Sequence, residues 1–127
     1  RREDVISLWA ATVGPDVAHK EASLMKARKY RDYLHLHGLG AELAEAAAAE
    51  TARQALADLA GQAVLPHAVR FSFGFPACPD LAAQTDLLRL LEAGKIGISL
   101  TDTCQMVPEL SVSGFLTLHP QACYFRP

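Results

Sequence analysis

Hydrophobic positions in the first sixty residues predict one strand followed by two helices. Residues 4–14 (DVISLWAATVG) are rich in β-branched and aromatic side chains and stop at a Gly-Pro pair, which predicts a buried strand. Pro15 suits the first turn of a helix, and we expect that helix to reach about residue 29. Residues 30–60 predict a longer helix, because alanine, the strongest helix former, dominates them.

The long helix is expected to pack through one apolar face. Alanine adds little bulk, so this helix can lie close to a neighbouring element. We expect a kink at its two glycines, Gly38 and Gly40. The residues at helical spacing that predict the packing face are Leu36, Leu39, Leu43, Ala46 and Ala47.

The second half alternates between short strands, turns and one helix. Asp80 is a good N-cap for that helix, and Gly94 is expected to end it. In chain order we expect a connection (61–67), a strand (69–73), an irregular segment (74–79), a helix (81–93), a short strand (96–101), a loop (105–110), a strand (111–118) and the start of another strand (123–125).

This order of elements predicts an α+β fold, in which an antiparallel or mixed sheet carries flanking helices. The 127 residues leave room for one core, so we expect residues 1–127 to form a single domain. The chain starts without Met, and a strand pattern begins within its first five residues. We therefore interpret it as a piece of a longer protein that is incomplete at both ends.

Charge and composition exclude several classes of function. The net charge of −2 argues against nucleic-acid binding, which needs a dense basic face. No apolar run approaches the roughly 18 residues of a membrane span. The three cysteines are widely spaced and odd in number, which fits reduced thiols in a cytoplasmic protein better than disulfides.

Two clusters of titratable residues have ordinary explanations. His35 and His37 could clip a metal on a strand, but residues two apart diverge on the helix predicted here, so we predict no metal site. The basic residues of positions 20–31 are expected to form a solvated helix face, with steering of an acidic protein partner as the alternative. No nucleophile elbow, P-loop or dinucleotide fingerprint is present.

The irregular segment after residue 69 carries the most chemistry. Gly74 allows close backbone approach, and the prolines at 76 and 79 fix the shape of the loop. Arg70 offers a planar fork for a carboxylate, and rings at 71, 73, 75, 124 and 125 could hold a flat heterocycle and a cation. An equally good interpretation has Arg70 bridging to an internal acid above an aromatic core.

Three blocks in chain order resemble the activation domain of cobalamin-dependent methionine synthase. Residues 70–80 (RFSFGFPACPD) resemble its Arg-x-x-x-Gly-Tyr-Pro-Ala-Cys-Pro signature. Residues 97–114 (GISLTDTCQMVPELSVSG) resemble its Leu-Thr-Glu…Met-x-Pro…Ser-Val-Ser-Gly stretch, and residues 119–125 (HPQACYF) resemble its His-Pro-x-x-x-Tyr end. Residues 4–14 and 33–39 are similar more loosely, so the resemblance spans nearly the whole chain.

The resemblance implies a function in the reactivation of an inactive form of cobalamin. A domain of this family binds S-adenosylmethionine, and a flavodoxin-type donor supplies an electron to cob(II)alamin. The methyl group of S-adenosylmethionine then traps the reduced cobalt as methylcobalamin. The cobalamin itself would be held by a corrinoid-binding partner domain, and the chain would contribute positioning to a methyltransferase without being catalytic alone.

The resemblance also implies which residues contact S-adenosylmethionine. Arg70 would pair with its carboxylate, and Ser72 stands where the family uses backbone contacts. Phe75 keeps the ring of the motif tyrosine without the hydroxyl group. The full set of expected contacts is Arg70, Ser72, Phe75, Ala77, Tyr124 and Phe125.

Departures from the family pattern support a rival function. Phe75 and Asp102 replace Tyr and Glu, and an acidic ligand contact that the family has near the start of the domain would precede Arg1. The alternative is therefore a non-catalytic protein-interaction module with a degenerate ligand site. A third hypothesis, a thiol-based redox protein, requires Cys78 to have a pKa well below the usual value of about 8.5.

Overall fold

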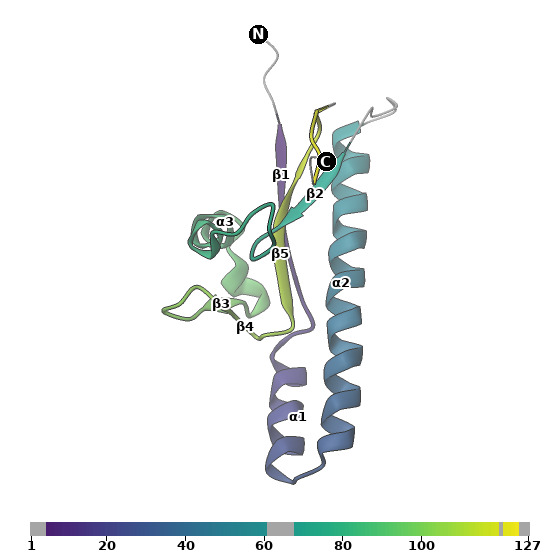
Figure 1. The fold of residues 1–127 in the computed structure, drawn as a ribbon, viewed down its shortest axis with the longest axis vertical. Helices are drawn as coiled ribbons and strands as arrows, with labels where there is room; N and C mark the ends of the chain where they lie inside the picture. Colours follow the sequence, from purple (N-terminus) through teal and green to yellow (C-terminus); the bar gives the residue numbers. More distant parts are fainter. Residues whose placement is uncertain (1–4, 61–67, 120, 125–127) are drawn as a thin grey trace.

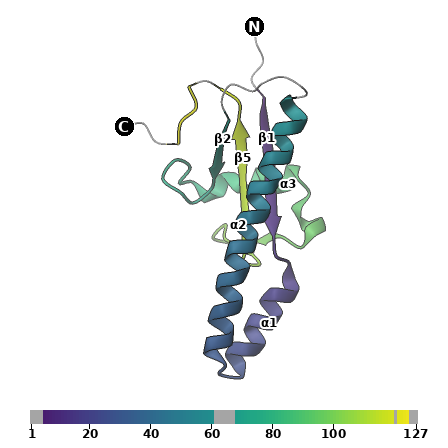
Figure 2. The same cartoon turned by 90° about the vertical axis from the view of Figure 1, so that its right-hand side faces the viewer.

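The structure is a computed structural model, which describes residues 5–60, 68–119 and 121–124. A three-stranded antiparallel sheet, in the order β1-β5-β2, forms the middle layer. Its strands are β1 (Ile6–Thr12), β5 (Ser111–Thr117) and β2 (Val69–Ser72). The predicted α+β class is confirmed, and of the two sheet types expected, the antiparallel one is present (Figures 1 and 2).

Gly114 is one of the residues of the central strand, β5, that are paired with both neighbouring strands. It pairs with Trp9 of β1 on one side and with Ser72 of β2 on the other. Directly opposed residues of antiparallel strands point to the same face, so Trp9 and Ser72 share the sheet face that the long helix α2 (Tyr30–Ala60) covers. The absence of a side chain at Gly114 leaves room between them.

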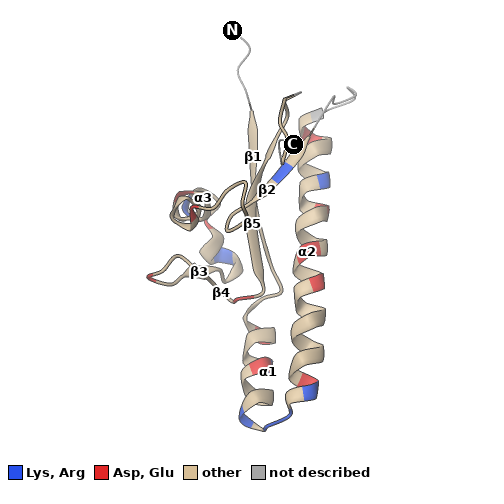
Figure 3. Ribbon diagram, in the orientation of Figure 1, with Lys and Arg blue, Asp and Glu red and all other residues tan. Residues whose placement is uncertain are grey.

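One face of the sheet is covered by α2 (Tyr30–Ala60). Together with α1 (Pro15–Lys26), α2 forms a helical hairpin that projects beyond the end of the sheet, where basic residues gather at its turn (Figures 1 and 3). The predicted bounds of the long helix are confirmed, whereas the first helix ends three residues earlier than expected. Helix α2 is a single uninterrupted helix, with a 3.1 Å contact between His37 Nδ1 and Glu21 Oε1 joining it to α1.

The packing face predicted for α2 is wrong for four of its five residues, since Leu36 is half-buried but Leu39, Leu43, Ala46 and Ala47 are exposed. Leu39 and Leu43 are more than half exposed, while Ala44, Ala48 and Ala52 are buried, with Ala48 fully so. The helix lies so close to the sheet that only small residues fit beneath it, and Ala48 packs against Trp9. The alanine content led us to expect a close approach of helix and sheet, and this approach places alanines in the interface and leaves Leu39 and Leu43 outside it.

The other face of the sheet carries a compact set of short elements. They are η1 (Leu81–Ala83), α3 (Gln84–Leu90), η2 (Ala93–Ile96) and the hairpin of β3 (Ser99–Leu100) and β4 (Met106–Val107). Their apolar side chains pack against the sheet residues Leu8 and Ala10. Asp80 caps η1 by accepting a 2.9 Å hydrogen bond from the backbone N–H of Ala82, as predicted.

Four expectations for the second half are wrong. The helix of residues 81–93 is divided into η1 and α3, and Gly94 lies inside η2 because Glu92, in the left-handed region at φ 51°, has already ended the α-helix. Residues 105–110 include β4, and no strand begins within residues 121–124. The expected connection at 61–67 and Phe125 lie outside the described residues.

Candidate functional site

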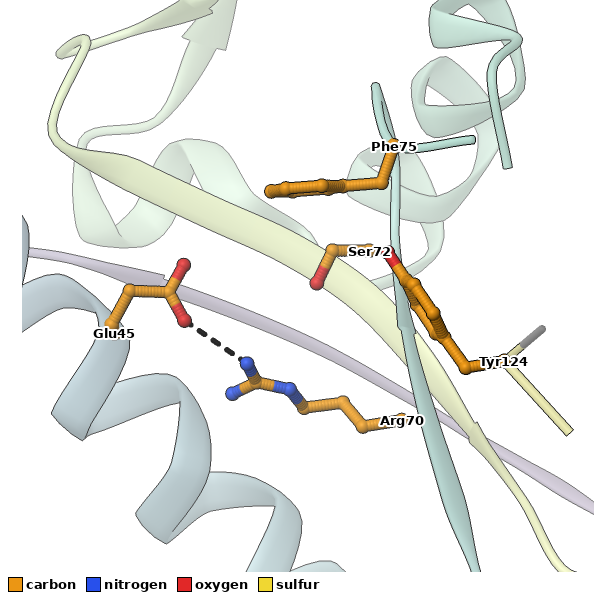
Figure 4. A pocket seen from close by; sticks show the side chains of 5 residues that line it. All are labelled: Glu45, Arg70, Ser72, Phe75 and Tyr124. Carbon is orange, nitrogen blue, oxygen red and sulfur yellow. Dashed lines mark hydrogen bonds and ion pairs between the residues drawn. The ribbon is translucent and has the colours of Figure 1, made fainter. Parts of the chain in front are cut away.

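A pocket of about 320 Å³ opens where the β2 edge of the sheet meets α2. Its lining residues come from four separate segments: α2, β2, the loop after β2 and the C-terminal segment. Figure 4 shows the five side chains arranged around one space. They are Glu45, Arg70, Ser72, Phe75 and Tyr124.

Arg70 is held by two partners at the wall of this pocket. Its Nη2 donates a 3.0 Å hydrogen bond to Oε2 of Glu45, and its Cζ lies 5.4 Å from the centre of the Trp9 ring. The arginine side chain remains 33% exposed, and Glu45 is 49% exposed. Both interpretations of Arg70 are thus present together, because the arginine that bridges to an acid also borders a cavity.

The ring of Tyr124 is placed by a stack of aromatic side chains. It stacks on Phe71, with 5.9 Å between ring centres, and Phe71 stacks in turn on Phe115 at 5.2 Å. Phe71 and Phe115 are paired across β2 and β5 on the face of α3, so the stack begins inside the sheet. Tyr124 therefore reaches the pocket around the edge of β2.

The loop that follows β2 presents Phe75 to the pocket. Gly74 has a positive φ of 84°, and its N–H donates a 3.0 Å hydrogen bond to the Cys78 carbonyl. The Cys78 N–H donates in turn to the Phe75 carbonyl at 2.8 Å, which closes the loop tightly. Phe75 is 49% exposed and lines the pocket, whereas Ala77 is exposed on the same loop and does not line it.

The structure therefore brings together four of the six expected contact residues, leaves Ala77 outside the lining and does not describe Phe125. Glu45 is the site residue that the sequence analysis missed. It lies 25 residues before Arg70, and next to Ala44, the start of the buried alanine stripe. A helical wheel built on small residues, rather than on leucines, would have placed Glu45 beside the sheet.

Cys78 does not have the properties of a redox thiol. Partial burial, followed by the nearby Asp80 carboxylate, raises its thiol pKa above the ordinary value. A reactive cysteine requires the opposite shift, so the direction of this pKa shift argues against a redox protein that uses Cys78.

The described part of the chain shows neither a metal-binding cluster nor a membrane-spanning helix. Residues 5–60, 68–119 and 121–124 contain no group of three or more His, Cys, Asp or Glu side chains placed to hold a metal ion. Among the helices of these ranges, none combines the length and the apolar character needed to cross a bilayer.

The pocket combines three kinds of recognition. The guanidinium of Arg70 can hold a carboxylate through two parallel hydrogen bonds. Glu45 supplies negative charge opposite it, and the rings of Phe75 and Tyr124 offer faces for a flat heterocycle or a cation. The arrangement suits a small zwitterion that also carries an aromatic group. The volume of the pocket lies at the lower end of the range of roughly 300–1,000 Å³ for small-molecule sites.

The sequence matches one protein family over almost its whole length. The family model described as "Vitamin B12 dependent methionine synthase, activation domain" covers residues 1–126. Methionine synthase of Mycobacterium tuberculosis is 35% identical over 140 residues, which include 97% of this chain, and methionine synthase of Mycobacterium leprae is 34% identical over the same share. The chain spans only 12% of the length of each of these relatives.

The fold is similar to a solved structure of a related domain. The crystal structure of the MetH reactivation domain bound to AdoHcy superposes with a TM-score of 0.85 at 25% sequence identity. The similarity covers 94% of this chain and 41% of that one.

Proposed function

The chain belongs to the family of vitamin B12-dependent methionine synthase activation domains, and we propose that its pocket binds S-adenosylmethionine. The observation that carries the proposal is the meeting of Arg70, Ser72, Phe75 and Tyr124, expected as contacts from separate sequence motifs, around one cavity. The related domain whose structure was solved with AdoHcy supports the same class of ligand, because AdoHcy is S-adenosylmethionine without its transferable methyl group.

Each pocket residue has a role in this proposal. Arg70 holds the ligand carboxylate, using guanidinium donors that Glu45 does not occupy, since the side chain has five. Glu45 attracts the positive ammonium and sulfonium groups, and Phe75 and Tyr124 contact the adenine ring. Ser72, which is 8% exposed, lies at the base of the pocket and presents backbone to the ligand.

The bound S-adenosylmethionine would serve as the methyl donor for reductive methylation of cobalamin. In this proposal the cobalamin is held by a separate corrinoid-binding domain, and a flavodoxin-type protein supplies the electron. The task of this chain is positioning: it fixes the amino acid and adenine ends so that the methyl group faces outward. No acid–base residue is required.

Isothermal titration of the chain with S-adenosylmethionine tests the proposal. Arg70→Ala is expected to weaken binding by about ten- to hundred-fold, as the loss of a charge-assisted hydrogen bond of roughly 1.5–3 kcal/mol implies. Arg89→Ala is the matched control, because Arg89 is exposed on α3 and paired only locally with Asp86. Equal binding by wild type and Arg70→Ala would remove Arg70 from the site.

A second variant tests the role of Glu45. Glu45→Gln keeps the shape of the side chain but removes its charge, so it should weaken S-adenosylmethionine, which has a sulfonium cation, more than AdoHcy, which has none. A variant that weakens both ligands equally would argue against attraction between Glu45 and the sulfonium. Absence of binding by the folded wild-type chain would favour the protein-interaction module.

A further inference from the structure

Trp9 is the only tryptophan of the chain, and it lies directly beside the pocket without lining it. Its ring is 2% exposed and packs against Ala11 and the fully buried Ala48 of α2. A Cβ atom at Gly114 would approach Cζ2 of Trp9 to 2.7 Å, so the indole lies closely on β5. These contacts pack the ring between α2 and β5.

The guanidinium of Arg70 lies over this ring. The 5.4 Å between Arg70 Cζ and the ring centre is within the range of about 6 Å for a cation–π interaction, and tryptophan is the strongest partner among the aromatic residues. The contact crosses the sheet from β2 to β1, above the strand position that Gly114 leaves empty. Glu45, the other partner of Arg70, is half-exposed and lies on a separate element.

The indole N–H of Trp9 is a second indication that this residue acts through the face of its ring, and not through its polar edge. Within the described residues, the buried Nε1 of Trp9 has no hydrogen-bond partner. Burying an unsatisfied donor is unfavourable, and a phenylalanine would fill much of this position without it. The larger indole offers a wider face to Arg70.

We propose that Trp9 is a positioning residue for ligand binding, which holds the Arg70 guanidinium flat so that its fork faces the pocket. The inference rests on the proposed function, because it assumes that Arg70 receives a ligand carboxylate. A carboxylate entering the pocket binds the guanidinium donors that Glu45 leaves free, and it leaves the face on Trp9 undisturbed. Trp9 therefore keeps Arg70 in place in both the empty and the occupied pocket.

Titration of Trp9→Leu and Trp9→Phe against two ligands tests this role. Trp9→Leu should weaken S-adenosylmethionine by about two- to thirty-fold, which is the range of a cation–π interaction, and Trp9→Phe should recover part of the loss. Methylthioadenosine, which lacks the amino-acid carboxylate, should bind wild type and both variants alike. In an Arg70→Ala background, Trp9→Leu should have no further effect.

Val112→Ala is the matched control for core packing, because Val112 contacts the same buried cluster as Trp9. It should lower thermal stability without selecting between the two ligands. If Trp9→Leu weakens both ligands equally, or if it adds its full effect to Arg70→Ala, Trp9 is a core residue only and the proposal is overturned.

A nuclear magnetic resonance measurement separates this proposal from the proposed function. The Nε–H proton of Arg70 should be shifted upfield by the indole ring current, and the shift should disappear in Trp9→Leu but persist in Val112→Ala. Absence of the shift in wild type overturns the positioning role. If the shift is present but S-adenosylmethionine does not bind, the proposed function fails and the positioning contact stands.

Discussion

Replacing Gly114 by alanine tests whether β5 and β2 are as close as the structure has them. The added Cβ would lie 1.9 Å from the Phe71 carbonyl oxygen and 2.7 Å from Trp9 Cζ2. Real Cβ atoms essentially never come within 3.0 Å of another heavy atom, and the nearer of these two atoms belongs to backbone, which cannot rotate away. The strand pair must therefore separate.

The expected cost of Gly114→Ala is at least about 3 kcal/mol, the upper end of the range for overpacked cores. For a chain of this size, that corresponds to a decrease of about 9–15 °C in the melting temperature. Thermal unfolding followed by circular dichroism measures it.

Two other glycines provide controls of the same chemistry. A Cβ at Gly38 meets nothing within 4 Å, so Gly38→Ala should raise stability by about 0.5–1 kcal/mol through helix propensity alone. At Gly40 the nearest atom is Leu110 Cδ1 at 2.4 Å, the end of a flexible side chain, so Gly40→Ala should fall between the other two. If the free energy of unfolding of Gly114→Ala lies within about 1 kcal/mol of the wild-type value, the close spacing of β5 and β2 is refuted.

Three further predictions concern the face of α3. Gln84, 1% exposed, donates to the Cys104 carbonyl and accepts a 3.1 Å hydrogen bond from Ser113, so Gln84→Ala should cost about 1–3 kcal/mol in urea unfolding, and a neutral variant would contradict this bridge. In a variant whose other two cysteines are serine, the alkylation rate of Cys78 should increase at a higher pH than that of an ordinary thiol, because the pKa of Cys78 is raised. Alkylation of Cys78 at neutral pH faster than that of an ordinary thiol would disprove the shift. Asp80→Asn should keep the helix cap but move that alkylation curve to lower pH, and an unmoved curve would exclude the charge of Asp80 as a cause.

The sequence was sufficient to predict local structure where one residue type determines the backbone conformation. Asp80 could be predicted as a cap because a side-chain carboxylate satisfies backbone N–H groups wherever a helix begins. The loop after β2 could be predicted as irregular because glycine and two prolines exclude a regular ladder. The end of α3 could not, because Glu92 adopts a left-handed backbone conformation that no composition rule assigns to glutamate.

The features that could not be predicted from the sequence are those that depend on the distance between two elements of the fold. Leucine content predicted the wrong face of α2, since the separation of helix and sheet, unknown from sequence, admits only alanine. Glu45 was missed for the same reason, because its role follows from facing a strand that begins 24 residues later. Four of the expected contact residues line one pocket, but the acid that pairs with Arg70 required the structure.

The three sequence blocks that carried the family resemblance meet at one strand, β2. The first block supplies Arg70 and Ser72, and the second supplies Gly114, which pairs directly with Ser72. The third supplies Tyr124, whose ring stacks on Phe71. These blocks are joined by strand pairing and ring stacking, so a substitution that separates β5 from β2 must also displace the Arg70 guanidinium from Tyr124. Substitutions in this part of the sheet should therefore lower both stability and ligand binding, whereas substitutions elsewhere should be able to lower one without the other.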